Sequence, residues 1–158
     1  MADLKAKGIM NKNIISVSKD WTIEKLSQFL DENSITGAPV VDSAGIPVGV
    51  VSVTDIARDH SIKRQILPES QPHDFYSSSE DLPGYQEVLS TLRIEPERKI
   101  LVKDIMTPMI FDVDEDTPVQ KIADTMIRGR IHRVFVTKQG KLTGIITALD
   151  MLKIIRDL

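Results

Sequence analysis

The sequence lacks several features that would place it in a familiar functional class. None of its 158 residues is a cysteine, which excludes disulfides, a thiol nucleophile and a cysteine-ligated zinc site. Aromatic residues make up only 4%, so a core must be built mainly from aliphatic side chains and methionine. The net charge is −3 and no basic stripe stands out, which argues against nucleic-acid binding. No apolar run reaches the roughly 18–20 residues that a membrane span needs.

The start of the chain and its chemistry favour a cytoplasmic protein that is not an enzyme. MADLKAKGIM lacks the apolar core of a signal peptide, and the absence of cysteine suits a reducing compartment. There is no nucleophile-elbow pattern, no P-loop and no HExxH motif. The acidic run FDVDEDTP has the charge for a divalent cation, but it also fits a helix N-terminus, where acids are favourable. We therefore expect no catalytic residues and no metal.

What the chain does contain is an internal repeat. Residues 9–39 align with residues 105–135, after which the turn DSAG of the first copy becomes the shorter turn KQG of the second. Beyond this turn Gly49 and Asp55 align with Gly144 and Asp150. A gap of one residue inside a glycine-containing surface turn is easily tolerated, so the match indicates a duplication.

Each copy is predicted to fold as β-α-β-β-α. In the first copy NIISVSKDW is typical of a strand, and TIEKLSQFLDEN has helical apolar spacing with Thr22 or Asp20 as its cap. APVVDSAGIPVGVVSV predicts a hairpin and TDIARDHSIKRQIL a second helix. The second copy repeats this order. The predicted fold class is α+β, with two small mixed sheets and helices sharing a core.

The repeats are expected at residues 7–65 and 102–158, with a long linker at residues 66–101. Several prolines and a serine run mark this linker as loop, and YQEVLSTLR predicts one short helix in it. Apolar residues such as Phe75, Tyr85 and Val88 are unusual in a pure tether. We therefore predict a partly ordered linker.

Three pairs of motifs in the same order resemble a tandem CBS-domain pair, also called a Bateman module. They are GIMNKNIISV and DIMTPMIFDV, ITGAPVVDSAG and IHRVFVTKQG, and GVVSVTD and GIITALD. The resemblance implies a pseudo-two-fold pair of repeats that binds an adenosine-containing nucleotide (AMP, ADP or ATP) in the cleft between them, with no required cofactor. It also implies regulation of a partner protein and a homodimer. The linker is longer than is usual in this family.

Two short motifs, Ser52-x-x-Asp55 and Thr147-x-x-Asp150, follow strands and open helices. Backbone N–H groups and the helix dipole at such a junction favour phosphate, and a carboxylate can accept hydrogen bonds from the two ribose hydroxyls. In the family pattern the Asp binds ribose and the hydroxyls, here also Thr54, face phosphate. The same residue types are also ordinary helix caps, which is the alternative interpretation.

The resemblance extends the predicted site to the start of the hairpin in each copy. His132 and Arg133 match a His-Arg pair that meets nucleotide phosphates, and Arg suits bidentate contacts with phosphate. The alternative is a solvated basic turn. The first copy has Thr36 and Gly37 there, so we expect the Asp150 site to bind phosphate-bearing adenosine more tightly than the Asp55 site. Positions matching the adenine slot, which also fit plain core packing, are Ile14, Ile110, Ala38, Pro39, Val134 and Phe135.

Two functions follow from these patterns. The first is a ligand-sensing regulatory module that changes how it meets a partner. The second is a structural dimerisation or interaction module without a physiological nucleotide, in which the Asp residues are only caps.

Overall fold

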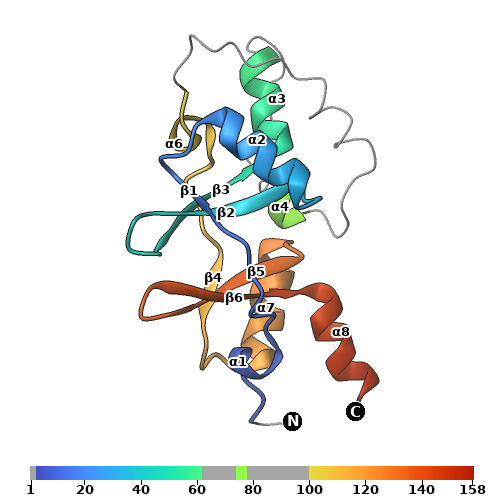
Figure 1. The fold of residues 1–158 in the computed structure, drawn as a ribbon. Helices are drawn as coiled ribbons and strands as arrows, with labels where there is room; N and C mark the ends of the chain where they lie inside the picture. Colours follow the sequence, from blue (N-terminus) through green and yellow to red (C-terminus); the bar gives the residue numbers. More distant parts are fainter. Residues whose placement is uncertain (1–2, 62–73, 78–99) are drawn as a thin grey trace. The chain divides into compact units, whose positions relative to one another are not determined.

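The computed structural model describes residues 3–61, 74–77 and 100–158, and these residues form two compact units (Figure 1). The first unit contains residues 15–61 and 100–109, and the second contains residues 3–14, 74–77 and 110–158. Each unit is a small mixed sheet with helices, as the sequence predicts. No helix in the described parts of the chain is long and apolar enough to cross a membrane.

The first unit is built on a three-stranded sheet in the order β1-β2-β3. Strand β1 runs parallel to β2, and β2 and β3 form an antiparallel hairpin. Its elements are β1 (Val17–Ser18), α2 (Ile23–Glu32), β2 (Gly37–Val41), β3 (Pro47–Ser52), α3 (Val53–Ser61) and α6 (Val102–Ile105).

The second unit repeats this topology in the sheet order β4-β5-β6. Strand β4 is parallel to β5, and β5 and β6 form the hairpin. Its elements are α1 (Ala6–Ile9), α4 (Asp74–Ser77), β4 (Asp112–Asp114), α7 (Val119–Gly129), β5 (Arg133–Lys138), β6 (Lys141–Thr147) and α8 (Ala148–Arg156). The predicted β-α-β-β-α order is confirmed in both copies.

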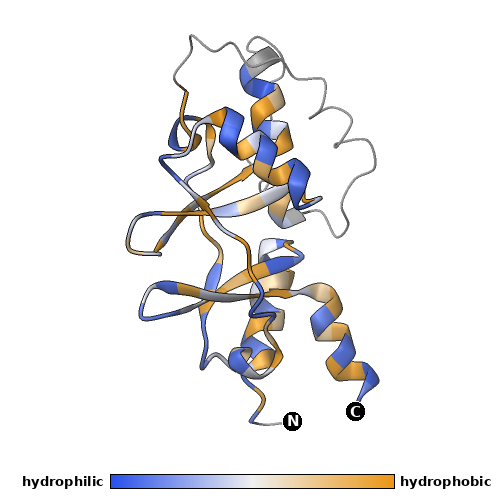
Figure 2. Cartoon of the chain, in the orientation of Figure 1, coloured by the Kyte–Doolittle hydropathy of each residue, from blue (hydrophilic) through white to orange (hydrophobic). Residues whose placement is uncertain are grey.

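Local sequence explains how helix α2 forms and which face it buries. The Thr22 hydroxyl accepts a hydrogen bond from the Lys25 N–H at 3.2 Å, which makes Thr22 rather than Asp20 the cap. Ile23, Leu26 and Leu30 recur at helical spacing and are buried, while charged residues cover the other face (Figure 2). The core of this unit is aliphatic, as the low aromatic content predicts.

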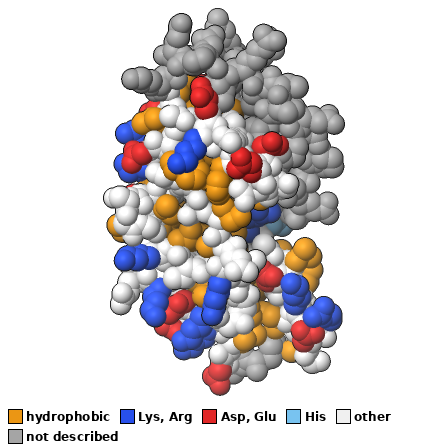
Figure 3. Space-filling view, viewed as in Figure 1, with side chains coloured by type: hydrophobic (Ala, Val, Ile, Leu, Met, Phe, Trp, Pro, Cys, Tyr) orange, Lys and Arg blue, Asp and Glu red, His pale blue; other side chains and the backbone are white. Residues whose placement is uncertain are grey.

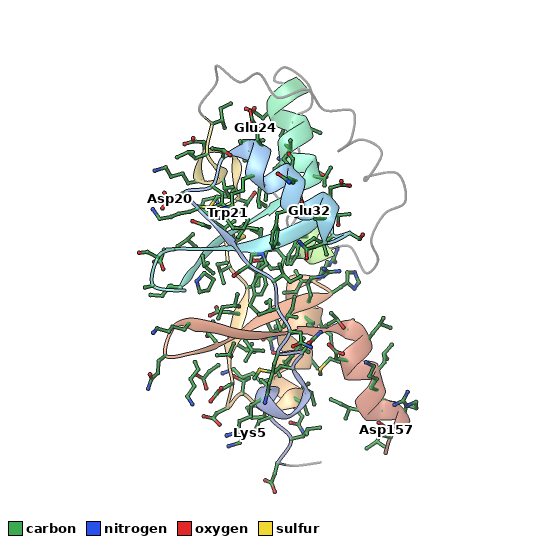
Figure 4. The ribbon with its side chains drawn as sticks, in the orientation of Figure 1. Lys5, Asp20, Trp21, Glu24, Glu32 and Asp157 are labelled. Atoms are coloured by element: carbon green, nitrogen blue, oxygen red, sulfur yellow. The ribbon has the colours of Figure 1, made fainter. Side chains whose placement is uncertain are left out.

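A pair of aromatic side chains borders this aliphatic core. Trp21, which Figure 4 labels at the start of α2, meets Phe29 edge to face with ring centroids 5.1 Å apart. The ammonium group of Lys25 lies 4.5 Å from the centroid of the Trp21 ring. These contacts hold the Trp21 ring, which precedes α2, against the first two turns of the helix.

Each unit is completed by the segment that opens the other repeat. We call residues 3–14 and 100–109 the opening segments. Asn11 and Ile145 exchange two backbone hydrogen bonds at 2.9 and 3.0 Å on strand β6, and Val50 and Thr107 exchange two at 3.0 and 2.9 Å on strand β3. Both contacts cover the exposed backbone of a sheet edge. The compact units therefore do not coincide with the sequence repeats.

The glycines shared by the two copies leave room for this exchange. A Cβ atom at Gly49 would lie 2.6 Å from the Thr107 carbonyl oxygen. One at Gly144 would lie 2.9 Å from the Asn11 carbonyl oxygen and 2.7 Å from the sulfur of Met10. A side chain at either position would push the opening segment off the strand.

In the linker, the structure describes a single turn of helix, α4, within the second unit. The helix predicted at YQEVLSTLR lies outside the described residues. Helix α4 is not predictable from the sequence, because four residues are too few to show a helical period.

Candidate functional site

The predicted site residues gather at one edge of each sheet, where the middle strand begins and the last strand ends. In the second unit Arg133 pairs with Thr147, and in the first unit Gly37 pairs with Ser52. Strand β4 is parallel to β5, so the segment that leads into Asp112 reaches the same edge. We call this the site edge of each unit.

Backbone hydrogen bonds close the site edge onto the following helix. The Ala148 N–H donates to the His132 carbonyl at 2.8 Å, and the Val53 N–H donates to the Thr36 carbonyl at 2.9 Å. The turn before each middle strand is thereby held against the first residue of the last helix. This places His132 beside the start of α8 and Thr36 beside the start of α3.

In the second unit the Thr147 and Asp150 side chains bond to each other and to the backbone. The Asp150 Oδ2 atom accepts from the Thr147 N–H at 2.9 Å and from its hydroxyl at 3.0 Å. The Asp150 N–H in turn donates to the Thr147 hydroxyl oxygen at 3.3 Å. This is a capping box, so the cap interpretation of the motif is correct as far as the Oδ2 atom is concerned.

The first unit has the same arrangement. The Asp55 Oδ2 atom accepts from the Ser52 N–H at 2.8 Å and from its hydroxyl at 3.3 Å, and the Asp55 N–H donates to that hydroxyl at 3.4 Å. Ser52 and Asp55 are both only 3% exposed. The hydrogen bonds to the backbone offset the cost of burying these polar groups.

The second carboxylate oxygen of each Asp faces a cation on the next helical turn. Asp150 Oδ1 lies 3.5 Å from the Lys153 ammonium nitrogen, and Asp55 Oδ1 lies 3.4 Å from a guanidinium nitrogen of Arg58. The Asp150 side chain is 20% exposed and the Asp55 side chain 1%. A carboxylate can use one oxygen as a cap and the other for a ligand hydroxyl, so the two interpretations of the motif are compatible.

The remaining predicted residues differ in how they are placed. His132 is exposed, whereas Arg133 and Ile110 are half-buried at the site edge of the second unit. Ala38 and Pro39 are buried in the first unit, and Ala38 belongs to its hydrophobic core, as the packing alternative implies. Thr36, Gly37 and Thr54 are half-buried, and Leu149, which replaces Thr54, is 62% exposed.

Ile14 is not grouped with the first site. It ends the opening segment that belongs to the second unit, whereas Ser52 and Asp55 lie in the first. Its predicted role beside the Asp55 pair stays a prediction.

Sequence reasoning missed an aromatic cluster at the site edge of the second unit. The chain has only seven aromatic residues, yet Phe75, Tyr76, Phe111 and Phe135 meet here with ring centroids 4.7–6.0 Å apart. Phe75 stacks on Phe135, and the Arg133 guanidinium carbon lies 5.0 Å from the centroid of the Phe75 ring. The scarcity of aromatic residues and the apolar character of Phe75 were the only hints in the sequence.

Tyr76 is fully buried in this cluster, as Phe135 is. It is 0% exposed, and burial raises the pKa of its phenol above the usual value. The Phe111 N–H donates to the Tyr76 hydroxyl oxygen at 3.2 Å, and the His132 N–H donates to the Tyr76 carbonyl at 2.7 Å. The tyrosine therefore joins the two backbone segments that border the site edge.

The acidic run forms strand β4 and the turn between β4 and helix α7. Asp116 lies 2.9 Å from the ammonium nitrogen of Lys7. The hydrogen bond and the opposite charge of Lys7 hold the pKa of Asp116 below its usual value, and the same hydrogen bond and the charge of Asp116 raise the pKa of Lys7. Among the residues that the structure describes, no three His, Asp or Glu side chains come together to hold a metal ion.

Comparison with known proteins agrees with this architecture. The family model of the CBS domain matches residues 6–60 and 102–157. The chain is 32% identical over 158 residues to uncharacterized protein MJ1404 of Methanocaldococcus jannaschii, covering 100% of the chain but 33% of that relative. It is also 32% identical over 133 residues, 83% of the chain, to the chloroplastic CBS domain-containing protein CBSX1 of Arabidopsis thaliana. The chain spans 54% of CBSX1.

Solved structures show the same fold. CBSX2 in complex with AMP matches with a TM-score of 0.63 and 22% identity, over 97% of the chain and 96% of that structure. The CBS domain pair of protein MJ0100, solved with 5-methylthioadenosine and S-adenosyl-L-methionine, matches with a TM-score of 0.61 and 21% identity, over 98% and 97% of the two chains.

Proposed function

The chain belongs to the CBS domain family, and we propose that it is a regulatory module that senses adenosine-containing nucleotides and modulates a partner protein. The observation that carries this proposal is the hydroxyl–carboxylate pair, built twice at a strand-to-helix junction. Two structures with this fold were solved with adenosine compounds, AMP in one and S-adenosyl-L-methionine in the other. The cysteine-free sequence favours a cytoplasmic setting for this module.

The residues of the second unit supply each contact that such a ligand needs. Asp150 Oδ1 would accept hydrogen bonds from the ribose hydroxyls in place of the Lys153 ammonium group. The guanidinium group of Arg133 and the imidazole of His132, with the N-terminus of the nine-residue helix α8, would hold phosphate. Ile110 would line the adenine slot.

The two sites are unequal in this proposal. The Asp150 carboxylate is more accessible than that of Asp55, and the adjacent turn carries His132 and Arg133 where the first unit has Thr36 and Gly37. We therefore assign tighter binding of AMP, ADP or ATP to the second unit. With Ser52, Thr54 and Asp55, the first unit would bind a less charged ligand or would bind the same nucleotides more weakly.

Calorimetric titration of AMP into Asp150→Asn and Asp55→Asn proteins tests this assignment. Asparagine keeps an oxygen for the cap but removes the charge and one acceptor. Losing about 1.4 kcal/mol of charged hydrogen bonding should weaken AMP binding by about tenfold in Asp150→Asn, and by much less in Asp55→Asn. Equal losses in the two variants would contradict the assignment.

A second candidate function is a structural dimerisation module, which the satisfied caps and an apolar face on α8 favour. Leu149, Leu152, Ile155 and Leu158 are each more than half exposed, and Figure 3 shows hydrophobic side chains among charged ones where α8 lies. The two functions differ in ligand-dependent stability. An adenosine ligand at about 100 times its dissociation constant would add about 2.7 kcal/mol of stability. If no adenosine compound at millimolar concentration raises the melting temperature, dimerisation alone is supported.

A further inference from the structure

Phe75 and Tyr76 of helix α4 contact the same groups at the site edge of the second unit that a purine ring would contact. Phe75 and Tyr76 precede Phe111 by about 35 residues, yet they pack on the strand β5 residue Phe135 and on Phe111 next to β4. They come from the linker between the repeats rather than from either repeat. The packing of the repeat therefore does not by itself explain why Phe75 and Tyr76 lie at the site edge.

Tyr76 takes up two backbone donors that face this edge. Its hydroxyl oxygen accepts from the Phe111 N–H and its carbonyl oxygen accepts from the His132 N–H, at 3.2 and 2.7 Å. A purine is a flat ring with acceptor nitrogens, and an apolar slot with backbone donors is what would bind it. A buried phenol ring with an acceptor oxygen presents the same combination of shape and polarity.

Phe75 engages the cation that the proposed function assigns to phosphate. The Arg133 guanidinium group lies over the Phe75 ring at 5.0 Å, a distance at which the cation and the ring attract each other. The same guanidinium group would have to turn towards a phosphate to grip it with two hydrogen bonds. Helix α4 therefore meets both the adenine end and the phosphate end of the proposed site.

We propose that helix α4 is a built-in competitor for the second site, so that an adenosine nucleotide binds there only by displacing Phe75 and Tyr76. This inference rests on the proposed function, because it concerns the same site. Displacement would convert ligand binding into release of helix α4, which is a change that a partner protein can sense. Because only molecules with α4 undocked can bind, the apparent affinity equals the intrinsic affinity multiplied by the fraction of molecules in which α4 is undocked.

The Tyr76→Phe variant tests the competition with the least disturbance. It keeps the ring in place and removes only the oxygen that accepts from the Phe111 N–H. Docking of α4 should weaken, and AMP measured by calorimetry should bind about threefold to tenfold more tightly than to the wild type. The Phe75→Ala/Tyr76→Ala double variant should show a larger gain. If it fails to fold, the single variant still decides the matter.

Amide hydrogen exchange supplies a readout that does not depend on affinity. In the absence of nucleotide, the Phe111 and His132 amides should exchange faster in the double variant than in the wild type. Phe111 loses the Tyr76 hydroxyl, and His132 loses the Tyr76 backbone carbonyl when helix α4 undocks. Saturating AMP should speed exchange of the α4 amides in the wild type. A matched control is Phe29→Leu on α2 of the first unit, which should alter neither the AMP affinity of the second site nor exchange at Phe111.

The outcomes separate the two proposals. AMP binding that is equal or weaker in both α4 variants would overturn the competition and leave the proposed function standing, since α4 would then be absent from the site or form one of its walls. Failure of AMP, ADP and ATP to bind the wild type and every variant would overturn the proposed function, and the competition with it.

Discussion

The buried hydroxyl of Tyr76 makes one side chain sensitive to alkaline solution. Its pKa is raised in the folded protein because burial disfavours the phenolate, while in the unfolded chain it ionises near pH 10. A group whose pKa is raised on folding contributes stability that is complete below its unfolded pKa. That contribution is lost as the pH rises towards the folded value.

We therefore expect the wild type to lose stability steeply above about pH 10, and the Tyr76→Phe variant to lose less. Urea denaturation at about pH 8 and about pH 11 measures the two free energies of unfolding. All other titratable residues are the same in the two proteins, so their contributions cancel in the comparison. Parallel losses in the two proteins would show that Tyr76 ionises as freely as an exposed tyrosine.

At the scale of elements, the contact between strand β3 and an opening segment depends on the absence of a side chain. Gly49 lies where the Thr107 carbonyl approaches closely, and both partners are backbone atoms of extended segments. Neither can move aside without breaking the two hydrogen bonds between Val50 and Thr107. The repeated glycine is thus a packing requirement of the exchange.

The Gly49→Ala substitution should destabilise the protein by about 1–3 kcal/mol, the usual cost of forcing extra volume into a packed site. Chemical denaturation measures this, and faster amide exchange at Val50 and Thr107 would locate the damage. Gly129→Ala is the control, because its Cβ would lie 3.5 Å or more from its neighbours at the end of α7. It should be neutral or stabilising by up to about 1 kcal/mol. A neutral Gly49→Ala protein would contradict the packing requirement.

At the scale of the whole molecule, helix α8 leaves apolar surface in water. Leu152 and Ile155 are 56% and 63% exposed, and with Leu149 they follow helical spacing along one face. Two copies of this face would bury each other's leucines in a symmetric contact. This is the surface that we assign to the proposed homodimer.

Leu152→Glu should halve the mass measured by light scattering after size-exclusion chromatography, because it places a charge in the centre of that contact. Ile46→Glu, on the β2–β3 hairpin and 41% exposed in the wild type, is the matched control and should leave the mass unchanged. A wild type that stays monomeric at concentrations of tens of micromolar would contradict the assignment of the α8 face to a homodimer.

The order of elements was predictable from the sequence because it depends on local patterns. Helical spacing, the DSAG and KQG turns with positive φ at Gly45 and Gly140, and the Thr22 cap all act over a few residues. The positions of Asp55 and Asp150 at helix starts were predictable because the Ser/Thr-x-x-Asp motif occurs at the same place in both copies. In each case the physical cause lies within one turn or one hairpin.

The partners of the opening segments and the docking of α4 were not predictable in this way. The Asn11–Ile145 pair joins distant parts of the chain, and no local period encodes it. Tyr76 reaches Phe111 across 35 positions from a four-residue helix. The matching glycines at positions 49 and 144 were visible, but their role became clear only when the approaching carbonyls were known.

The exchange of opening segments has a consequence for any cleavage of the chain between its two repeats. Within each compact unit, the strand edge beside Gly49 or Gly144 is sealed by residues that belong to the other copy. A fragment that ends before residue 100 would keep strand β3 but lose Thr107, which pairs with Val50. A fragment that begins after residue 14 would keep strand β6 but lose Asn11, which pairs with Ile145. Each half of the chain therefore depends on the other to cover one edge of its sheet.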